Sequence, residues 1–307
     1  MRGTAFIFPG QGSQVVGMGQ DVAEAYPEAR QTFAQADAIL GFSISDLCFC
    51  GPEDALNDTV NTQPAVFVAS LAVFRAIRAR GRGPKATMMA GHSLGELTAL
   101  TAAGSMSFVD GLRLVRERGR LMKLAGERSP GGMVAVLKMD DSEVARACLE
   151  ATEQTGKPAQ IANYNSPGQV VISGDSEALD RAVAILRERG GRRIIPLAVS
   201  IAAHSPLMAT AVEEYRLAVD AITFRVPEVP VIANVSARPL NSVDEIRAEL
   251  TAQLTWPVRW TGSVASMAAD GIARFLEVGP KDVLSKLVKR IDPGVESSSV
   301  NDVASIE

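Results

Sequence analysis

Short apolar runs alternate with amphipathic stretches through the first 130 residues. Residues 4–8 and 86–90 are apolar runs of strand length, and apolar positions recur at helical spacing over 21–40, 64–80 and 109–125. The alternation returns after residue 205, with predicted strands at 230–234 and 274–278 and predicted helices at 206–221, 243–254, 258–269 and 281–291. Strands that alternate with helices predict an α/β fold with a mostly parallel sheet.

The middle of the chain has a different order of elements. Strands are predicted at 133–137, 159–163, 169–173 and 193–199, and helices at 141–155 and 177–189. This β-α-β-β-α-β order is that of a ferredoxin-like unit. We therefore predict a small ferredoxin-like subdomain (129–199) inserted into a large α/β-hydrolase-like subdomain (1–128 and 200–291), followed by a mobile tail (292–307) rich in Pro, Gly, Ser and acidic residues.

The composition of the 307 residues is that of a globular protein, with 47% hydrophobic and 21% charged residues. The N-terminal apolar run is too short for a secretory signal, and no stretch reaches about 18 consecutive apolar residues, so we expect a cytoplasmic protein without a membrane span. A net charge of −4 and 5% aromatic residues argue against a nucleic-acid partner. The three cysteines, Cys48, Cys50 and Cys148, favour neither a disulfide framework nor a metal site, and we expect free thiols.

Residues 91–95 fit the pattern G-x-S-x-G between a predicted strand and an alanine-rich helix. At such a sharp turn the hydroxyl of Ser93 would project, and the backbone N–H of Leu94 at the helix N-terminus would suit an oxyanion. Ser93 and Glu96 also fit a capping box, in which the serine only closes the end of a helix. The pattern alone leaves both interpretations open.

A serine nucleophile needs a base, and the chain has only two histidines, His92 and His204. Neighbouring side chains at a sharp turn usually diverge, which disfavours His92 as the partner of Ser93. His204 follows a predicted strand and precedes Ser205, a suitable N-cap for a helix. The helix N-terminus would keep His204 neutral, and we predict that it is the base, although a histidine in a loop is often structural.

Arg118 lies on the apolar side of the helix predicted at 109–125, whose inward stripe comprises Leu114, Val115, Leu121, Met122 and Ala125. A buried arginine needs a partner, because an unpaired buried charge is costly. Its planar guanidinium suits a carboxylate. The partner is either an internal Asp or Glu or the carboxylate of a ligand, and the helix pattern does not decide between them.

Several segments together resemble the malonyl-CoA:acyl carrier protein transacylase family, and the match covers about residues 4–291. They are F-P-G-Q-G-S-Q at 8–14, N-T-Q-P-A at 61–65, G-H-S-L-G-E at 91–96, R-G at 118–119, N-x-N-S-P-G at 163–168, His204 and G-P at 279–280. The resemblance implies that Ser93 is the nucleophile and His204 its base. It also implies an oxyanion hole made by the backbone N–H groups of Gln11 and Leu94, and a malonyl carboxylate bound by Arg118.

The resemblance further implies that the backbone carbonyl of Gln253 orients His204, without an acidic residue, and that Gln63 and Asn165 line the cleft between the subdomains. The implied reaction is a ping-pong transfer of malonyl from malonyl-CoA to the phosphopantetheine thiol of acyl carrier protein through an acyl-serine, without a cofactor, by a monomer. Fatty-acid synthesis is the expected setting. The alternatives are a polyketide or malonate-metabolising carrier, and water as acceptor in a serine hydrolase. Ala203 departs from the larger residue common before the histidine and leaves room for methylmalonyl.

Overall fold

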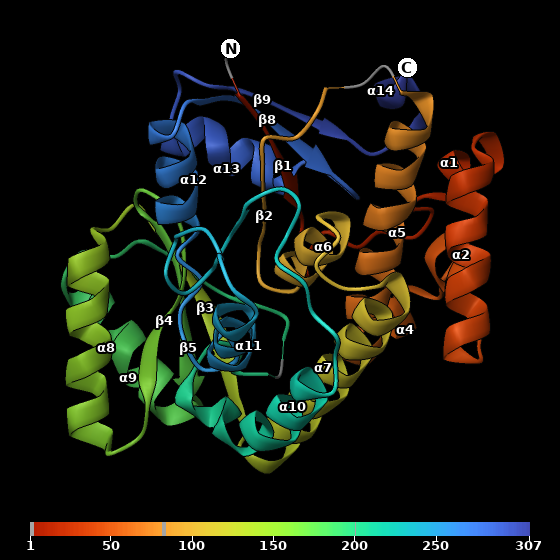
Figure 1. Cartoon of the computed structure of the whole chain (residues 1–307). Helices are drawn as coiled ribbons and strands as arrows, with labels where there is room; N and C mark the ends of the chain where they lie inside the picture. The colour runs from red at the N-terminus through yellow and green to blue at the C-terminus, as the bar shows by residue number, and fades with distance from the viewer. Residues whose placement is uncertain (1–2, 82–83, 200) are drawn as a thin grey trace.

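The computed structural model describes residues 3–81, 84–199 and 201–307 and shows two packed subdomains (Figure 1). The large subdomain contains a five-stranded sheet in the order β7 (Val231–Ile232), β2 (Met88–Gly91), β1 (Gly3–Phe8), β8 (Ile272–Val278) and β9 (Glu296–Val300). All four strand pairs are parallel, which confirms the predicted α/β fold. Residue 200, the predicted start of the second large segment, lies outside the described residues.

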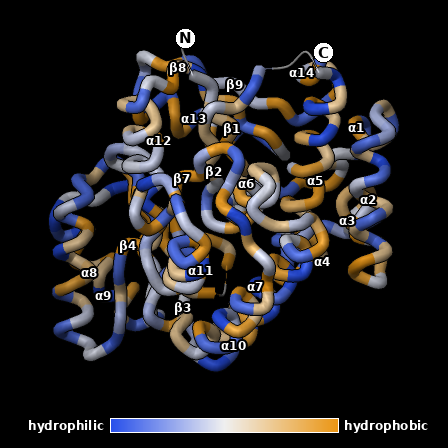
Figure 2. Tube along the Cα trace, viewed as in Figure 1, coloured by the Kyte–Doolittle hydropathy of each residue, from blue (hydrophilic) through white to orange (hydrophobic). Residues whose placement is uncertain are grey.

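Helices cover both faces of the parallel sheet (Figure 1). In chain order they are α1 (Gln20–Ala25), α2 (Pro27–Leu40), α3 (Ile44–Cys50), α4 (Glu53–Asn57), α5 (Thr59–Arg80), α6 (Leu94–Ala102), α7 (Phe108–Arg128), a 3-10 turn (Pro206–Met208), α10 (Ala209–Asp220), α11 (Val243–Ala252), α12 (Trp260–Ala269), α13 (Val283–Ile291) and α14 (Val303–Ile306). Figure 2 shows hydrophobic and hydrophilic residues alternating along outer helices such as α2, as expected for amphipathic helices. The helix predicted over 21–40 is two helices, because Pro27 starts α2 after the extended residue Tyr26.

The helix predicted from residue 64 begins five residues earlier. Asp58 caps α5 by accepting a hydrogen bond from the N–H of Val60, and Pro64 lies inside the helix. By length and composition α5 could cross a membrane, but 83% of its most apolar window is buried inside the protein. Such burial is what a core helix of an α/β subdomain requires.

The small subdomain comprises β3 (Gly131–Leu137), α8 (Asp141–Thr155), β4 (Ala159–Ser166), β5 (Gln169–Asp175), α9 (Ser176–Glu188) and β6 (Arg193–Pro196). Its sheet has the order β4-β5-β3-β6 with antiparallel pairs, and its own apolar core lies between this sheet and the helices α8 and α9. The predicted ferredoxin-like order of elements is therefore present. β4 also joins the large subdomain, because the N–H of Tyr164 donates to the carbonyl of Val258 at 2.9 Å.

The prediction of a mobile tail over 292–307 is wrong. β9 pairs with β8 along five residues, and α14 follows it. The backbone N–H of Val303 donates to Asp21, and Arg80 donates to the carbonyl of Ile306. The polar composition did not predict this strand, because an edge strand is held by backbone pairing and buries few side chains. Here the buried side chain is mainly that of Val300.

Candidate active site

The carboxyl ends of three parallel strands meet beside the small subdomain. Gln11 follows β1, Ser93 follows β2 and Asn234 follows β7. The edge at the carboxyl ends of parallel strands is where ligands bind in open α/β sheets. A cavity of about 490 Å³ lies there, and residues of both subdomains line it, among them Gln11, Ser93, Leu94, Arg118, Asn165, Val171, Ala203, His204 and Leu284.

Ser93 occupies a strained turn between β2 and α6. Its φ is 54°, in the left-handed region that non-glycine residues rarely adopt. A Cβ at Gly91 would lie 1.9 Å from the Gly95 backbone, and one at Gly95 would lie 2.2 Å from the carbonyl oxygen of Phe8, so only glycine fits at either position. The Ser93 side chain makes no capping hydrogen bond to α6, so the helix-cap interpretation is wrong. Its hydroxyl is free for another partner.

That partner is His204, whose Nε2 lies 2.8 Å from the Ser93 Oγ. The other ring nitrogen, Nδ1, lies 2.7 Å from the backbone carbonyl oxygen of Gln253. A carbonyl only accepts hydrogen bonds, so Nδ1 carries the proton and the Nε2 lone pair faces the serine. Burial, followed by the positive charge of Arg118, lowers the pKa of His204 to about 3, which keeps the imidazole neutral. Ser205 caps the following turn through the N–H of Leu207, as predicted.

His92 points away from its neighbour Ser93, as the sequence predicted. Its Nε2 lies 2.9 Å from Asn165 Oδ1, and its ring packs edge-on against Trp260. Because Asn165 lies on β4, this contact joins the turn after β2 to the small subdomain. His204 is thus the histidine that can accept the serine proton.

Arg118 is 1% exposed, and its hydrogen bonds go to neutral groups. Nη1 donates to Gln63 Oε1 at 2.8 Å, while Nη2 donates to Gln253 Oε1 at 2.8 Å and to Ser93 Oγ at 3.1 Å. No ion pair among the described residues involves Arg118, and its Nε has no partner there. The internal acid that the sequence left open is therefore not paired with it in the described part of the chain.

Comparison with known proteins gives the family of this fold and site. The sequence-family model of the acyl transferase domain matches residues 5–306 of this chain. The chain belongs to the acyl transferase family. It is 45% identical over 298 residues to the malonyl CoA-acyl carrier protein transacylase of Escherichia coli K12, with 97% of this chain and 96% of the relative covered. The Bacillus subtilis transacylase is 41% identical over 307 residues, covering 100% and 96%.

Solved structures agree with this assignment. The chain is similar to an acyl carrier protein S-malonyltransferase from Vibrio cholerae, with a TM-score of 0.95, 42% identity and coverage of 99% and 98% of the two chains. It is also similar to a malonyl-transacylase solved in complex with a holo acyl-carrier protein of a type II polyketide synthase, with a TM-score of 0.96, 42% identity and coverage of 99% and 97%. The two-subdomain fold is thus that of this acyl transferase family.

A buried polar cluster supports the serine of this acyl transferase from behind. Asn234 Oδ1 accepts from the Ser93 N–H at 2.7 Å, and Asn234 Nδ2 donates to the Gly91 carbonyl at 2.7 Å. Gln253 Nε2 donates to the Ser93 carbonyl at 3.1 Å and to the carboxylate of Glu96. Burial and the neighbouring Glu249 raise the pKa of Glu96 well above its ordinary value. Both backbone groups of the strained serine are therefore held by side chains.

Asn234 was not predicted from the sequence. The available signal was its place at the end of the strand predicted over 230–234, because polar residues at the carboxyl ends of parallel strands reach the ligand edge. The prediction that Gln63 lines the cleft is wrong. Asn165 lines the cavity, but Gln63 is fully buried behind Arg118, where its amide oxygen accepts from the guanidinium.

The backbone N–H groups of Gln11 and Leu94 remain available. Both residues line the cavity, and within the described residues neither N–H donates to a protein acceptor. Across 3–81, 84–199 and 201–307 no cluster of His, Cys, Asp or Glu has the arrangement of a metal site, and the three cysteines are free. The groups that face the cavity thus include a hydroxyl, an imidazole, a guanidinium and two peptide donors, with amides such as that of Asn165 beside them.

Proposed function

We propose that this acyl transferase moves a malonyl group from malonyl-CoA to the phosphopantetheine thiol of an acyl carrier protein. One observation carries the proposal: the Ser93 hydroxyl lies between the base His204, at 2.8 Å, and the buried guanidinium of Arg118, at 3.1 Å. The relatives named malonyl CoA-acyl carrier protein transacylase support the same donor and acceptor.

In the first half-reaction His204 Nε2 takes the hydroxyl proton as the Ser93 Oγ attacks the thioester carbonyl. The oxyanion of the tetrahedral intermediate would accept hydrogen bonds from the N–H groups of Gln11 and Leu94. When the C–S bond breaks, His204 returns the proton to the leaving thiolate, and coenzyme A departs as a thiol. The product is a malonyl ester of Ser93.

The second half-reaction reverses these roles. The phosphopantetheine thiol of the carrier gives its proton to His204, its sulfur attacks the ester carbonyl, and the C–O bond to Ser93 breaks as the serine oxygen is protonated. The Nδ1–H of His204 keeps its proton and donates to the carbonyl of Gln253 throughout, which stabilises the imidazolium of each step without a carboxylate. The proposed steps use protein groups and two thiols, without a resident cofactor.

Arg118 would select the acyl group. It is buried, positively charged and hydrogen-bonded to neutral partners, so the free carboxylate of malonyl would supply the missing counter-charge. A serine hydrolase has no need of such a group. Ala203 and Leu94 also line the cavity, and the small side chain of Ala203 leaves space for methylmalonyl as a second substrate.

The setting of the reaction is part of the proposal. Fatty-acid synthesis in the cytoplasm by a monomer is the expected setting. The alternatives are the carrier of a polyketide synthase and that of a malonate-metabolising complex. One of the similar proteins was solved in complex with the acyl-carrier protein of a type II polyketide synthase, which is the first of these alternatives. Assays with carriers of each kind separate them.

The test is the intact mass of the protein after incubation with malonyl-CoA. We expect an increase of one malonyl group in the wild type and none in Ser93→Ala, and we expect the adduct to disappear when holo carrier protein is added. Incubation with methylmalonyl-CoA and acetyl-CoA measures the acyl preference. An unmodified wild type would contradict the proposed reaction, and loss of the adduct without a carrier would favour hydrolysis.

A further inference from the structure

The loop that follows β1 is exposed but held by side chains from other segments. Thr59 Oγ1 donates to Gln11 Oε1 at 2.8 Å. Lys281 Nζ donates to the carbonyl of Gly12 at 3.2 Å, and within the loop the N–H of Gly12 donates to Gln14 Oε1 at 2.7 Å. The position of the Gln11 N–H in the cavity therefore depends on contacts outside the loop.

The contact from Thr59 continues to the guanidinium that faces the nucleophile. Gln63 Nε2 lies 3.3 Å from Thr59 Oγ1, and Gln63 Oε1 accepts from Arg118 Nη1 at 2.8 Å. Arginine only donates, so the oxygen of the Gln63 amide must face Arg118 and its NH₂ must face Thr59. The hydroxyl of Thr59 then accepts from Gln63 and donates to Gln11. We call this directed chain, from Arg118 through Gln63 and Thr59 to Gln11, the Thr59 relay.

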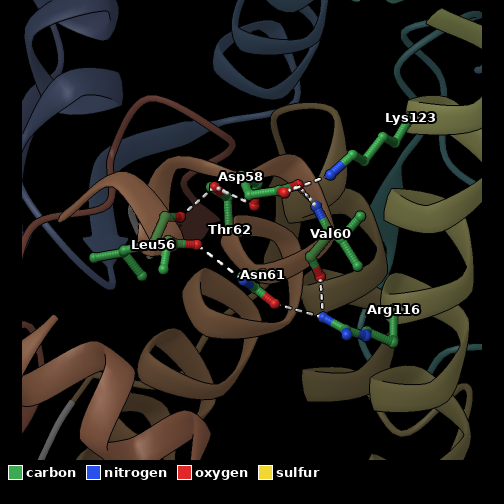
Figure 3. Close-up of polar contacts among 8 residues, drawn as sticks. Leu56, Asp58, Val60, Asn61, Thr62, Arg116 and Lys123 are labelled. Atoms are coloured by element: carbon green, nitrogen blue, oxygen red, sulfur yellow. Dashed lines mark hydrogen bonds and ion pairs between the residues drawn. The ribbon is translucent and has the colours of Figure 1, made fainter. Parts of the chain in front are cut away.

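The start of α5, which carries the relay, contacts α7 through Arg116 and Lys123 (Figure 3). Pro64 has no N–H that could donate to the carbonyl of Val60. Arg116 Nη1 donates to this carbonyl instead, at 2.7 Å. Lys123 Nζ pairs with Asp58 at 2.5 Å. Arg116 and Lys123 flank Arg118 along the same helix. The Arg116 contact holds the turn of α5 that carries Gln63, whereas the exposed pair of Lys123 with Asp58 contributes little.

We infer that Thr59 is a positioning residue, which sets the loop carrying the Gln11 N–H relative to Arg118 through its hydroxyl. The inference rests on the proposed function, in which these two groups bind the oxyanion and the acyl carboxylate. The Thr59 hydroxyl is placed to keep both at fixed positions about Ser93. Thr59 is itself 5% exposed and lies at the wall of the cavity, next to Gln11.

Thr62 is a matched control on the same helix. It is fully buried, and its hydroxyl donates to the carbonyls of Leu56 at 2.5 Å and Asp58 at 3.1 Å (Figure 3). These contacts support the start of α5 and do not belong to the Thr59 relay. Replacing either threonine by valine keeps the shape and removes one buried hydroxyl, so the two variants differ in which network they interrupt.

The experiment compares Thr59→Val, Thr59→Ser and Thr62→Val by the rate at which Ser93 is acylated in a single turnover, measured by intact mass. We expect Thr59→Val to acylate about tenfold more slowly with both malonyl-CoA and acetyl-CoA, below the roughly 10²–10³-fold cost of removing an oxyanion donor. Thr59→Ser should restore most of the rate. Thr62→Val should lose thermal stability to a similar extent and stay within about twofold of the wild-type rate.

Equal rates in Thr59→Val and Thr62→Val would overturn the inference. A slower rate with malonyl-CoA alone would also overturn it, because Thr59 would then act on Arg118 and not on the oxyanion loop. If Thr59→Val does not fold, Gln11→Met replaces it, since methionine keeps the backbone N–H and removes the side-chain acceptor; an unchanged rate would reject the role of Thr59. Absence of a malonyl adduct on the wild type would instead reject the proposed function.

Discussion

The two faces of α7 place an arginine in opposite environments. On the outer face Arg120 is half exposed and pairs with Glu117 at 2.6 Å and Glu214 at 3.4 Å. On the inner face Arg118 is buried and bonded to two amides and one hydroxyl. Water screens the outer pairs, so they contribute little, while the inner charge is 1% exposed and no acid contacts it directly among the described residues. The absence of an acid in contact with a buried arginine, more than the presence of the arginine, thus identifies a site for a ligand carboxylate.

Replacing Arg118 by alanine should have the largest effect. The malonyl carboxylate would lose its charge-assisted hydrogen bonds, each worth about 1.5–3 kcal/mol, so acylation by malonyl-CoA should fall by roughly 100-fold or more. Acylation by acetyl-CoA, which has no carboxylate, should fall far less. Rates of Ser93 acylation with each thioester measure the ratio. An unchanged malonyl rate would show that Arg118 does not bind the acyl carboxylate.

The inner face also sets the response to pH. Burial and then Arg118 lower the pKa of His204 to about 3, so acylation should stay level from pH 8 to pH 5. A base with the ordinary histidine pKa of about 6.5 would lose roughly thirtyfold over that range. In Arg118→Ala the acid limb, followed with acetyl-CoA, should move to higher pH. A wild-type limb near pH 6.5 would contradict the neutral, buried imidazole.

The same lowered pKa has a consequence for stability, with a defined sign. The unfolded chain binds a proton at His204 below about pH 6.5, whereas the folded protein does not until about pH 3. Above about pH 6.5 the imidazole is neutral in both states, and the folded state keeps its full stability. As the pH falls from there toward 3, the unfolded chain takes up a proton and the free energy of unfolding decreases. Thermal unfolding should show that His204→Gln loses less stability than the wild type between pH 7 and pH 4.

Gln63→Glu would give Arg118 an acid and make the inner face resemble the outer one. Because Gln63 Oε1 already lies 2.8 Å from Arg118, the new carboxylate would neutralise the guanidinium and compete with malonyl. We expect the ratio of malonyl to acetyl acylation to fall about tenfold. The ratio is the proper readout, because any disturbance of the Thr59 relay affects both thioesters. A preserved ratio would mean that the carboxylate binds elsewhere.

Replacing Arg120 by alanine should have the smallest effect. Its exposed pairs contribute about 0–1 kcal/mol, and none of them reaches the cavity. Thermal unfolding and the acylation rate should both remain near the wild type. A large loss of activity would remove the distinction between the two faces of α7.

The sequence predicted the site where local pattern decides the structure. Ser93 lies in a motif with two obligatory glycines, His204 was one of only two histidines, and Arg118 interrupted an apolar stripe. Asn234 and Thr59 were not predicted, because their contacts depend on which strand lies beside β2 and on how α5 meets α7. Those contacts join residues far apart in the chain, and local hydrophobic periodicity does not predict such contacts.

The fold shows the same division. The parallel sheet and the inserted subdomain followed from the order of apolar runs. β9 did not, because its hydrogen bonds to β8 need no apolar sequence. The start of α5 was predicted too late, because the apolar periodicity begins only at Pro64. The helix continues through this proline, and a long-range donor, Arg116, satisfies the carbonyl that the proline leaves open.

The order of strands in the large sheet has a consequence for how the protein is made. β1 lies at the centre of the sheet, yet Ala5 pairs with Phe275, 270 positions later, while the strands of the small subdomain pair within one continuous segment. During synthesis the small subdomain can fold as soon as it emerges from the ribosome. The apolar β1, in contrast, keeps one edge unpaired until β8 has been synthesised. The nascent chain should therefore need protection from aggregation at its first strand for most of its translation.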